Sequence, residues 1–180
     1  MSQPSPAILF LTGASGVGKT TIVKTIQANN TNTDYAFFFS DAHGVASIDE
    51  MLEQAGSLKR YQELLTHKHV KYITDNYPNT STVIFEGQAR FNFIEDACNS
   101  FGVKQYSIIL IDCAWKEMHL RLCNERKQPE LANFSMRTWA RFLRTQARAT
   151  NIPIIDTSKV TLSEAVKIVQ SYLSILIGAV

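Results

Sequence analysis

Short apolar runs alternate along the chain with longer segments in which apolar residues recur every three or four positions. The runs are typical of strands buried on both faces, because a parallel sheet covered by helices has no polar face. They predict five strands, at residues 7–11, 36–39, 82–85, 106–111 and 153–156. The periodic segments predict helices at residues 19–29, within 47–76, and at 91–100, 115–126, 135–149 and 162–176.

This alternation of strands and helices is typical of an α/β fold. Right-handed crossovers then give an open parallel sheet with helices on both faces, and ligands bind at the carboxyl ends of its strands. The whole chain, 1–180, is expected to be one domain with a helical region at about 44–77 and a small lid at about 124–136. Thr161 and Glu164 have the spacing of a capping box at the start of the last helix.

The segment between the first strand and the first helix fits the pattern G-x-x-x-x-G-K-[ST], in which each fixed position serves phosphate binding. The loop glycines let the backbone wrap around phosphates, the lysine reaches the β- and γ-phosphates, and the hydroxyl of Thr20 binds Mg²⁺. The alternative is a glycine-containing turn, which average composition would produce in this form in about one chain in a hundred. The spacing G-x-G-x-x-G of dinucleotide sites is absent. ATP with Mg²⁺ is therefore the expected ligand of Gly13, Ala14, Ser15, Gly16, Val17, Gly18, Lys19, Thr20 and Thr21.

With these motifs the chain resembles the small P-loop kinases, which include nucleoside monophosphate kinases and gluconate, shikimate and antibiotic phosphotransferases. The resemblance rests on the phosphate loop, on Asp41 after the second strand, on the run from Leu110 through Arg126, and on the segment Asp156, Thr157 and Ser158. It implies a three-layer fold with sheet order 2-3-1-4-5, lid arginines that clamp the transferred phosphate, and a loop at 156–158 that packs along the adenine. The strings typical of individual subfamilies are missing, so the resemblance does not name the acceptor.

Two carboxylates follow predicted strands near the phosphate loop. Asp41 could accept the proton of an acceptor hydroxyl or hold a Mg²⁺-bound water; it could instead cap a turn. Glu86 could orient metal-bound water, although acidic residues also end strands without such a role. The choice between Asp41 and Glu86 as base stays open. His43, Gln88 and Arg90 are further candidates for contact with the acceptor.

Arginines are concentrated in the region that the resemblance assigns to the lid. Arg121 and Arg126 are expected to stabilise charge during transfer. Five residues apart, they would lie about 140° from each other on an ideal α-helix, so the helix should end before Arg126 if both are to face the phosphate.

Four further arginines recur at helical spacing: Arg137, Arg141, Arg144 and Arg148. Arg144 and Arg148 are expected on a solvated helix face. For Arg137 and Arg141, a solvated face and a part in phosphate transfer are equally open.

Overall composition narrows the partners and the compartment. The net charge of +2 is too small to indicate nucleic acid binding, and His67, Lys68 and His69 are expected on the surface. Three cysteines without CxxC spacing favour reduced thiols in a cytoplasmic protein. No apolar segment is long enough to span a bilayer. The oligomeric state is not indicated.

The sequence therefore predicts a Mg²⁺-dependent kinase that transfers the γ-phosphate of ATP to a small-molecule acceptor. Lys19, Asp41, Glu86, Arg121 and Arg126 are its expected catalytic residues. The alternatives are a nucleotide-binding regulatory ATPase without such an acceptor and, less favoured, a kinase of nucleic-acid ends.

Overall fold

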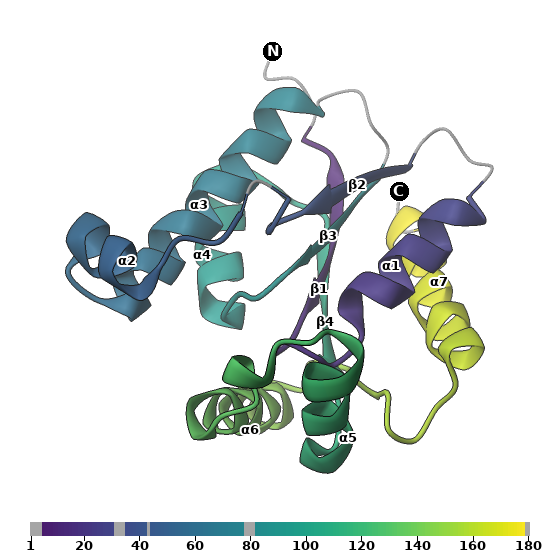
Figure 1. The fold of residues 1–180 in the computed structure, drawn as a ribbon. Helices are drawn as coiled ribbons and strands as arrows, with labels where there is room; N and C mark the ends of the chain where they lie inside the picture. Colours follow the sequence, from purple (N-terminus) through teal and green to yellow (C-terminus); the bar gives the residue numbers. More distant parts are fainter. Residues whose placement is uncertain (1–4, 31–34, 43, 78–81, 179–180) are drawn as a thin grey trace.

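The fold is built around one parallel sheet of five strands. A computed structural model describes residues 5–30, 35–42, 44–77 and 82–178. The strands are β1 (Ala7–Thr12), β2 (Tyr35–Phe39), β3 (Thr82–Gly87), β4 (Tyr106–Asp112) and β5 (Ile154–Asp156). Their order in the sheet is β2-β3-β1-β4-β5, so the order implied by the resemblance is confirmed. Figure 1 labels the first four strands.

The register of the sheet aligns the carboxyl ends of the three strands that carry the predicted site. Thr12 of β1 pairs with Gly87 of β3, and Phe39 of β2 pairs with Glu86 of β3. The phosphate loop, Glu86 and the residues after Phe39 therefore meet at one edge of the sheet, as expected for a parallel α/β fold.

Helices connect the strands and cover both faces. They are α1 (Lys19–Ala28), α2 (Ile48–Ala55), α3 (Leu58–Asn76), α4 (Phe91–Ser100), α5 (Trp115–Leu120), the π-helix η1 (Arg121–Glu125), the 3-10 helix η2 (Pro129–Leu131), α6 (Phe134–Ala149) and α7 (Leu162–Gly178). None of the helices in the described residues is long and apolar enough to cross a membrane.

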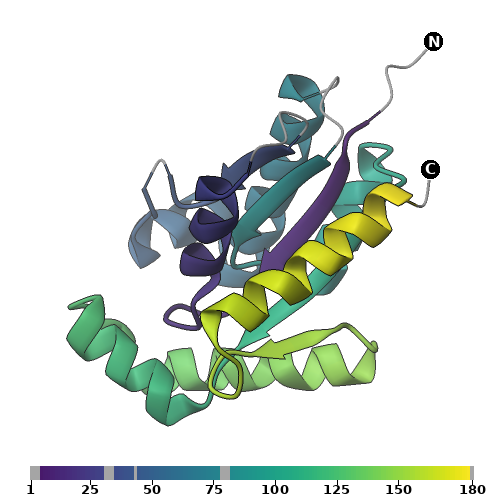
Figure 2. The same ribbon diagram turned by 90° about the vertical axis from the view of Figure 1, so that its right-hand side faces the viewer.

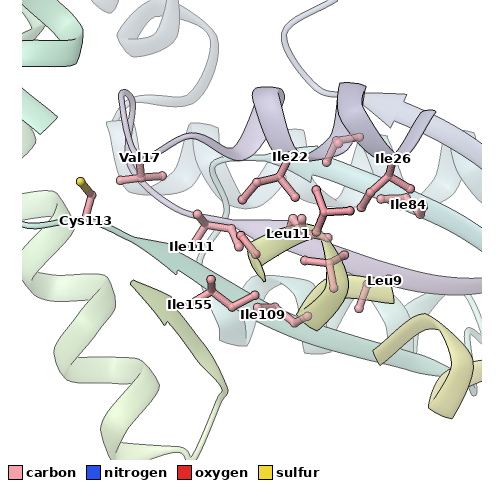
Figure 3. Close-up of a cluster of buried hydrophobic side chains, with 14 of the residues drawn as sticks. Leu9, Leu11, Val17, Ile22, Ile26, Ile84, Ile109, Ile111, Cys113 and Ile155 are labelled. Carbon is pink, nitrogen blue, oxygen red and sulfur yellow. The ribbon is translucent and has the colours of Figure 1, made fainter. Parts of the chain in front are cut away.

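Two buried clusters hold the three layers together. On one face, α1 and α7 pack against β-strand residues such as Leu11, Ile84 and Ile111, as Figure 3 shows. On the other face, α3, α4 and α6 pack against residues such as Phe10 and Phe85. Figure 2 shows α7, in yellow, running along the face that it shares with α1. The central strand β1 is buried along its whole length, which explains its uninterrupted apolar run.

Local signals explain where several helices begin and end. The predicted helical region at 47–76 is divided at Gly56, which ends α2 with a φ of 73°, and Ser57, whose side chain caps α3. The predicted capping box of α7 is confirmed, because Thr161 and Glu164 exchange hydrogen bonds of 2.7 Å and 3.3 Å. The segment 115–126 is helical as predicted, but its last turn is a π-helix.

Candidate active site

The phosphate loop joins β1 to α1 and is packed too closely for side chains at two of its glycines. A Cβ atom on Gly13 would lie 2.2 Å from the carbonyl oxygen of Ile111. Gly16 has a φ of 82°, in the left-handed region, and a Cβ atom there would lie 2.8 Å from Cγ of Leu122. The loop therefore needs glycine both for its backbone conformation and for its contact with β4 and η1.

Lys19 lies buried at the start of α1 with its ammonium group turned back into the loop. Its Nζ donates to the carbonyl oxygens of Gly13 and Ala14, each at 2.9 Å, and lies 3.7 Å from Oε1 of Glu86. Burial lowers the pKa of Lys19, against the attraction of Glu86 and Asp41. The phosphate loop thus holds one buried cation at the place where the motif positions it for an anionic ligand.

Glu86 is the buried carboxylate at the end of β3. Burial raises its pKa, and the charge of Lys19 opposes that effect. The neighbouring side chain of Thr20 also opposes the rise in the pKa of Glu86. The carboxylate therefore joins the lysine and the hydroxyl of the phosphate-loop motif in one cluster.

The donor set fits a Mg²⁺ ion that keeps most of its waters. Among the described residues no group of three or more His, Cys, Asp or Glu side chains could hold a metal ion. Mg²⁺ beside a nucleotide needs less than that, because phosphates and waters fill most of its octahedral shell. The hydroxyl of Thr20, with Glu86 next to it, supplies the kind of oxygen ligands that such an ion uses.

Asp41 lies at the same edge, just after β2. It accepts a hydrogen bond of 3.1 Å from the hydroxyl of Ser40, and the backbone N–H of Ser40 donates to the carbonyl oxygen of Glu86 at 2.9 Å. Asp41 is exposed, and it is close enough for its charge to affect the pKa values of both Lys19 and Glu86. The structure thus brings the two predicted carboxylates to one site. His43 lies outside the described residues.

Arg121 and Arg126 line the same cavity of about 230 Å³, with Gly16, Gly18, Lys19, Thr20, Thr21 and Glu125. The helical segment ends at Glu125, so the prediction that the helix ends before Arg126 is confirmed. Its last turn is a π-turn, in which the N–H of Arg126 donates to the carbonyl oxygen of Arg121 at 2.9 Å. A π-turn carries more residues than an α-turn, so side chains five positions apart come round to the same side.

Thr157 connects the loop after β5 to the phosphate loop. Its hydroxyl donates to the carbonyl oxygen of Val17 at 2.8 Å and accepts from Nη1 of Arg121, also at 2.8 Å. Asp156 accepts hydrogen bonds from both the N–H and the hydroxyl of Ser158, which fixes the shape of this loop. A cavity of about 200 Å³ lies between Thr157, Arg121 and the start of α7. Its position suits the base of a nucleotide whose phosphates occupy the loop.

Gln88 and Arg90 have protein partners instead of facing open space. The amide of Gln88 donates to the hydroxyl of Ser15 at 3.0 Å and accepts from the indole N–H of Trp139 at 3.1 Å. The guanidinium of Arg90 lies 4.5 Å from the ring centre of Phe142 and 5.1 Å from that of Trp139. These contacts tie α6 to the phosphate loop, and contact of either residue with an acceptor stays a prediction.

The arginines of α6 do not form one solvated face, so the expectation for Arg144 is wrong. Arg144 makes a two-pronged ion pair with the buried Asp112, in which Nη2 lies 2.9 Å from Oδ1. The hydrogen bond to Asp112 raises the pKa of Arg144. Arg148 is exposed, as expected, and Arg137 lies 5.9 Å from the ring centre of Trp115.

A further cavity borders Asp41 and has a volume of about 510 Å³, larger than the two cavities described above. The residues that line it were not predicted from the sequence. Part of its lining is apolar or aromatic and comes from β2, α2 and α3: Phe38, Met51, Tyr61, Leu65 and Tyr72. His69, which was expected on the surface, is half-buried against Phe38 and Phe85, with ring centres 5.2 Å and 5.9 Å away. The residues of α3 that line the cavity recur at helical spacing, but their direction is set by how α3 packs.

Comparison with known proteins places the fold but gives no close relative. A comparison with protein families finds no match, and one with curated proteins finds none. Among solved structures, the chain is similar to a sugar kinase from Janibacter sp. HTCC2649, with a TM-score of 0.64, 15% identity and coverage of 94% of this chain and 95% of that one.

Two further structures show the same likeness. A shikimate kinase from Acinetobacter baumannii in complex with shikimate has a TM-score of 0.58 and 16% identity, with 94% of each chain covered. A deoxyadenosine kinase from M. mycoides with bound dATP has a TM-score of 0.58 and 13% identity, with 93% of this chain and 99% of that one covered. The fold is thus that of small-molecule and nucleoside kinases.

Proposed function

We propose that this chain, which has the fold of the P-loop small-molecule kinases, transfers the γ-phosphate of ATP to a hydroxyl group of a small acceptor in the presence of Mg²⁺. One observation carries the proposal: the buried Lys19 and Glu86 and the exposed Asp41 meet at one edge of the sheet, beside a cavity that is lined in part by aromatic side chains. A regulatory ATPase that only changes its contacts with a partner protein would need the phosphate loop. It would not need a carboxylate such as Asp41 between that loop and a cavity of about 510 Å³.

The residues of the site divide the work of the reaction. Lys19 and the amides of the phosphate loop hold the β- and γ-phosphates, and Thr20 holds Mg²⁺, directly or with Glu86 through water. The ion, when bound, neutralises charge on the phosphate oxygens. Asp41 accepts the proton of the acceptor hydroxyl, because it borders both the phosphate site and the cavity. Glu86 remains the alternative base.

The segment from Arg121 onward supplies the cationic wall of the phosphate site. Arg121 and Arg126 stabilise the negative charge of the transferred group, since they line the cavity that contains Lys19 and Thr20. We further propose that residues 124–136 form a lid that excludes water from this cavity, and that the loop at 156–158 lies along the adenine.

Paired substitutions test the nucleotide site. Lys19→Ala should abolish ATP binding, measured by calorimetry, because it removes the one buried cation of the loop. The matched control is Lys24→Ala, an exposed lysine on the same helix, which should bind ATP normally. Equal affinities in the two variants would contradict the assignment of the site.

Asp41→Asn tests the transfer step. It should lower kcat about 10²- to 10⁴-fold, the usual contribution of a general base, and leave ATP affinity within about twofold. Asp96→Asn, an exposed carboxylate on α4, is the control. If instead Glu86→Gln alone causes the loss of kcat, Glu86 is the base. If no acceptor raises ADP release above the rate in water, the chain is an ATPase and the kinase proposal fails.

A further inference from the structure

The cavity beside Asp41 has a composition that narrows the acceptor. This inference rests on the proposed function and concerns the same site. Three aromatic side chains, Phe38, Tyr61 and Tyr72, contribute to its lining. Phe38 forms part of the floor, because its ring is stacked on Phe85 with centres 5.5 Å apart and an angle of 11° between the planes.

Helix α3 presents two tyrosines and a leucine to the cavity, on a stripe that also carries Lys68. Tyr61, Leu65 and Tyr72 lie at positions i, i+4 and i+11, so they are on one side of the helix. The buried side of α3, with Val70 and Ile73, packs instead against the sheet and α4. These three residues are therefore not part of the core, and Tyr72 keeps 48% of its surface exposed.

Helix α2 faces this stripe without a core of its own. No residue of α2 is buried, and Ile48 and Leu52 remain 62% and 43% exposed. The helix is nevertheless well defined at its start, where Ser47 and Glu50 form a capping box with hydrogen bonds of 2.7 Å and 3.3 Å. Of the apolar residues of α2, Met51 lines the cavity, so an apolar ligand there would cover part of its surface.

The charges around the cavity argue against an anionic acceptor. Among its described lining residues there is no arginine, and the lysine is Lys68, which is exposed. The two acids are Asp41 and Glu50, and Glu50 is engaged in the capping box. An acceptor that carries a phosphate of about two negative charges would need guanidinium or ammonium partners. An open-chain polyol would leave the aromatic walls without apolar contact.

Gln54 adds a polar group with a defined chemistry to the rim. A side-chain amide offers one donor and one acceptor side by side, which matches the hydrogen-bonding edge of a nucleobase. Aromatic side chains stack on the faces of bases, and Asp41 is positioned for a hydroxyl. A volume of about 510 Å³ is within the range of small-ligand pockets.

We infer that the acceptor is a nucleoside without a phosphate of its own, held with its base among Tyr61, Tyr72 and Phe38 and with a sugar hydroxyl at Asp41. In the reaction the hydroxyl oxygen forms a bond to the γ-phosphorus of ATP, the bond from that phosphorus to the β,γ-bridging oxygen breaks, and the hydroxyl proton passes to the Asp41 carboxylate. The products are a nucleoside monophosphate and ADP.

Release of ADP from ATP, measured with one acceptor at a time, tests this choice. The acceptors are the common ribo- and deoxyribonucleosides, their 5′-monophosphates, shikimate, gluconate and glucose. At least one nucleoside should exceed each of the other classes in kcat/KM by about tenfold or more. A higher kcat/KM with a monophosphate, a sugar or an acid overturns the inference and leaves the kinase proposal in place.

Two variants locate the binding. Tyr72→Ala should raise the KM for the nucleoside about tenfold, equivalent to about 1.4 kcal/mol, while the KM for ATP stays unchanged. Tyr72→Phe should keep the wild-type KM, and Tyr172→Ala, on α7 at the other face of the sheet, is the matched control. Equal effects of Tyr72→Ala and Tyr172→Ala contradict the assignment.

Binding without turnover separates the two proposals. If no acceptor raises ADP release, the proposed function fails, and calorimetry with nucleosides alone then tests the cavity. Nucleoside binding that Tyr72→Ala weakens about tenfold supports the inference even in that case. No nucleoside binding at millimolar concentration refutes it.

Discussion

Arg144 and Arg148 lie one turn apart on α6, yet the structure predicts very different consequences when each is replaced by methionine. Arg144 holds the carboxylate of Asp112, which is 4% exposed, whereas Arg148 is exposed and has no ion-pair partner among the described residues. Removing one partner of a buried pair leaves an uncompensated charge and costs about 3–5 kcal/mol. Because the Arg144 side chain is 33% exposed, we expect the lower end, about 3 kcal/mol.

Thermal unfolding followed by circular dichroism measures this difference. For a chain of this length about 1 kcal/mol shifts Tm by about 2–4 °C, so Arg144→Met should lower Tm by about 6–12 °C. Arg148→Met should change it by about 2 °C at most, as usual for surface substitutions. In an Asp112→Asn background most of the Arg144→Met effect should disappear, because no buried charge is left unpaired. Equal shifts for both arginines, or an undiminished loss in that background, would refute this reasoning.

Three further results are expected. Gly16→Ala should weaken ATP binding about tenfold or more, since its Cβ would lie 2.8 Å from Leu122, whereas Gly102→Ala, where the added atom meets nothing within 4 Å, should not. A thiol reagent at pH 8 should label Cys123 quickly and Cys98 slowly, because Cys98 is buried and its pKa is raised to about 12; two fast thiols would contradict this. If Glu86 is the base, kcat/KM should fall on the acidic side with a midpoint above pH 4.5, the ordinary pKa of glutamate, because burial raises the pKa of Glu86 and its ionised form appears only at higher pH. Glu86→Gln should then remove this acidic fall, whereas an unchanged pH profile in that variant would leave Asp41 as the base.

The elements of the fold could be predicted because their signals are local. A strand buried on both faces is an apolar run, as in β1, and a capping box such as that of Thr161 needs only four residues. The order of the strands came from the resemblance, since nothing in the spacing of apolar runs indicates which strand lies at the centre.

The site residues that lie at or just after the ends of strands could be predicted from the sequence. The contacts that depend on how helices pack against the sheet could not. Glu86 lies at the end of β3, and Lys19 and Asp41 come after β1 and β2, so their meeting at one edge follows from the parallel sheet. The pairing of Arg144 with Asp112 spans 32 positions, and no pattern links the two. The bonds of Gln88 to Ser15 and Trp139 likewise depend on how α6 lies against the sheet.

The π-turn at Arg121–Glu125 makes the relative direction of the Arg121 and Arg126 side chains depend on a residue count. Deleting one residue from this turn would leave the arginines in the chain but let the segment rewind as an α-helix. Each residue of an α-helix advances by about 100°, so the following side chains would turn away from the phosphate site by about that angle. Length variation in η1 is therefore a route by which related chains could lose or regain a complete cationic wall without changing a single arginine.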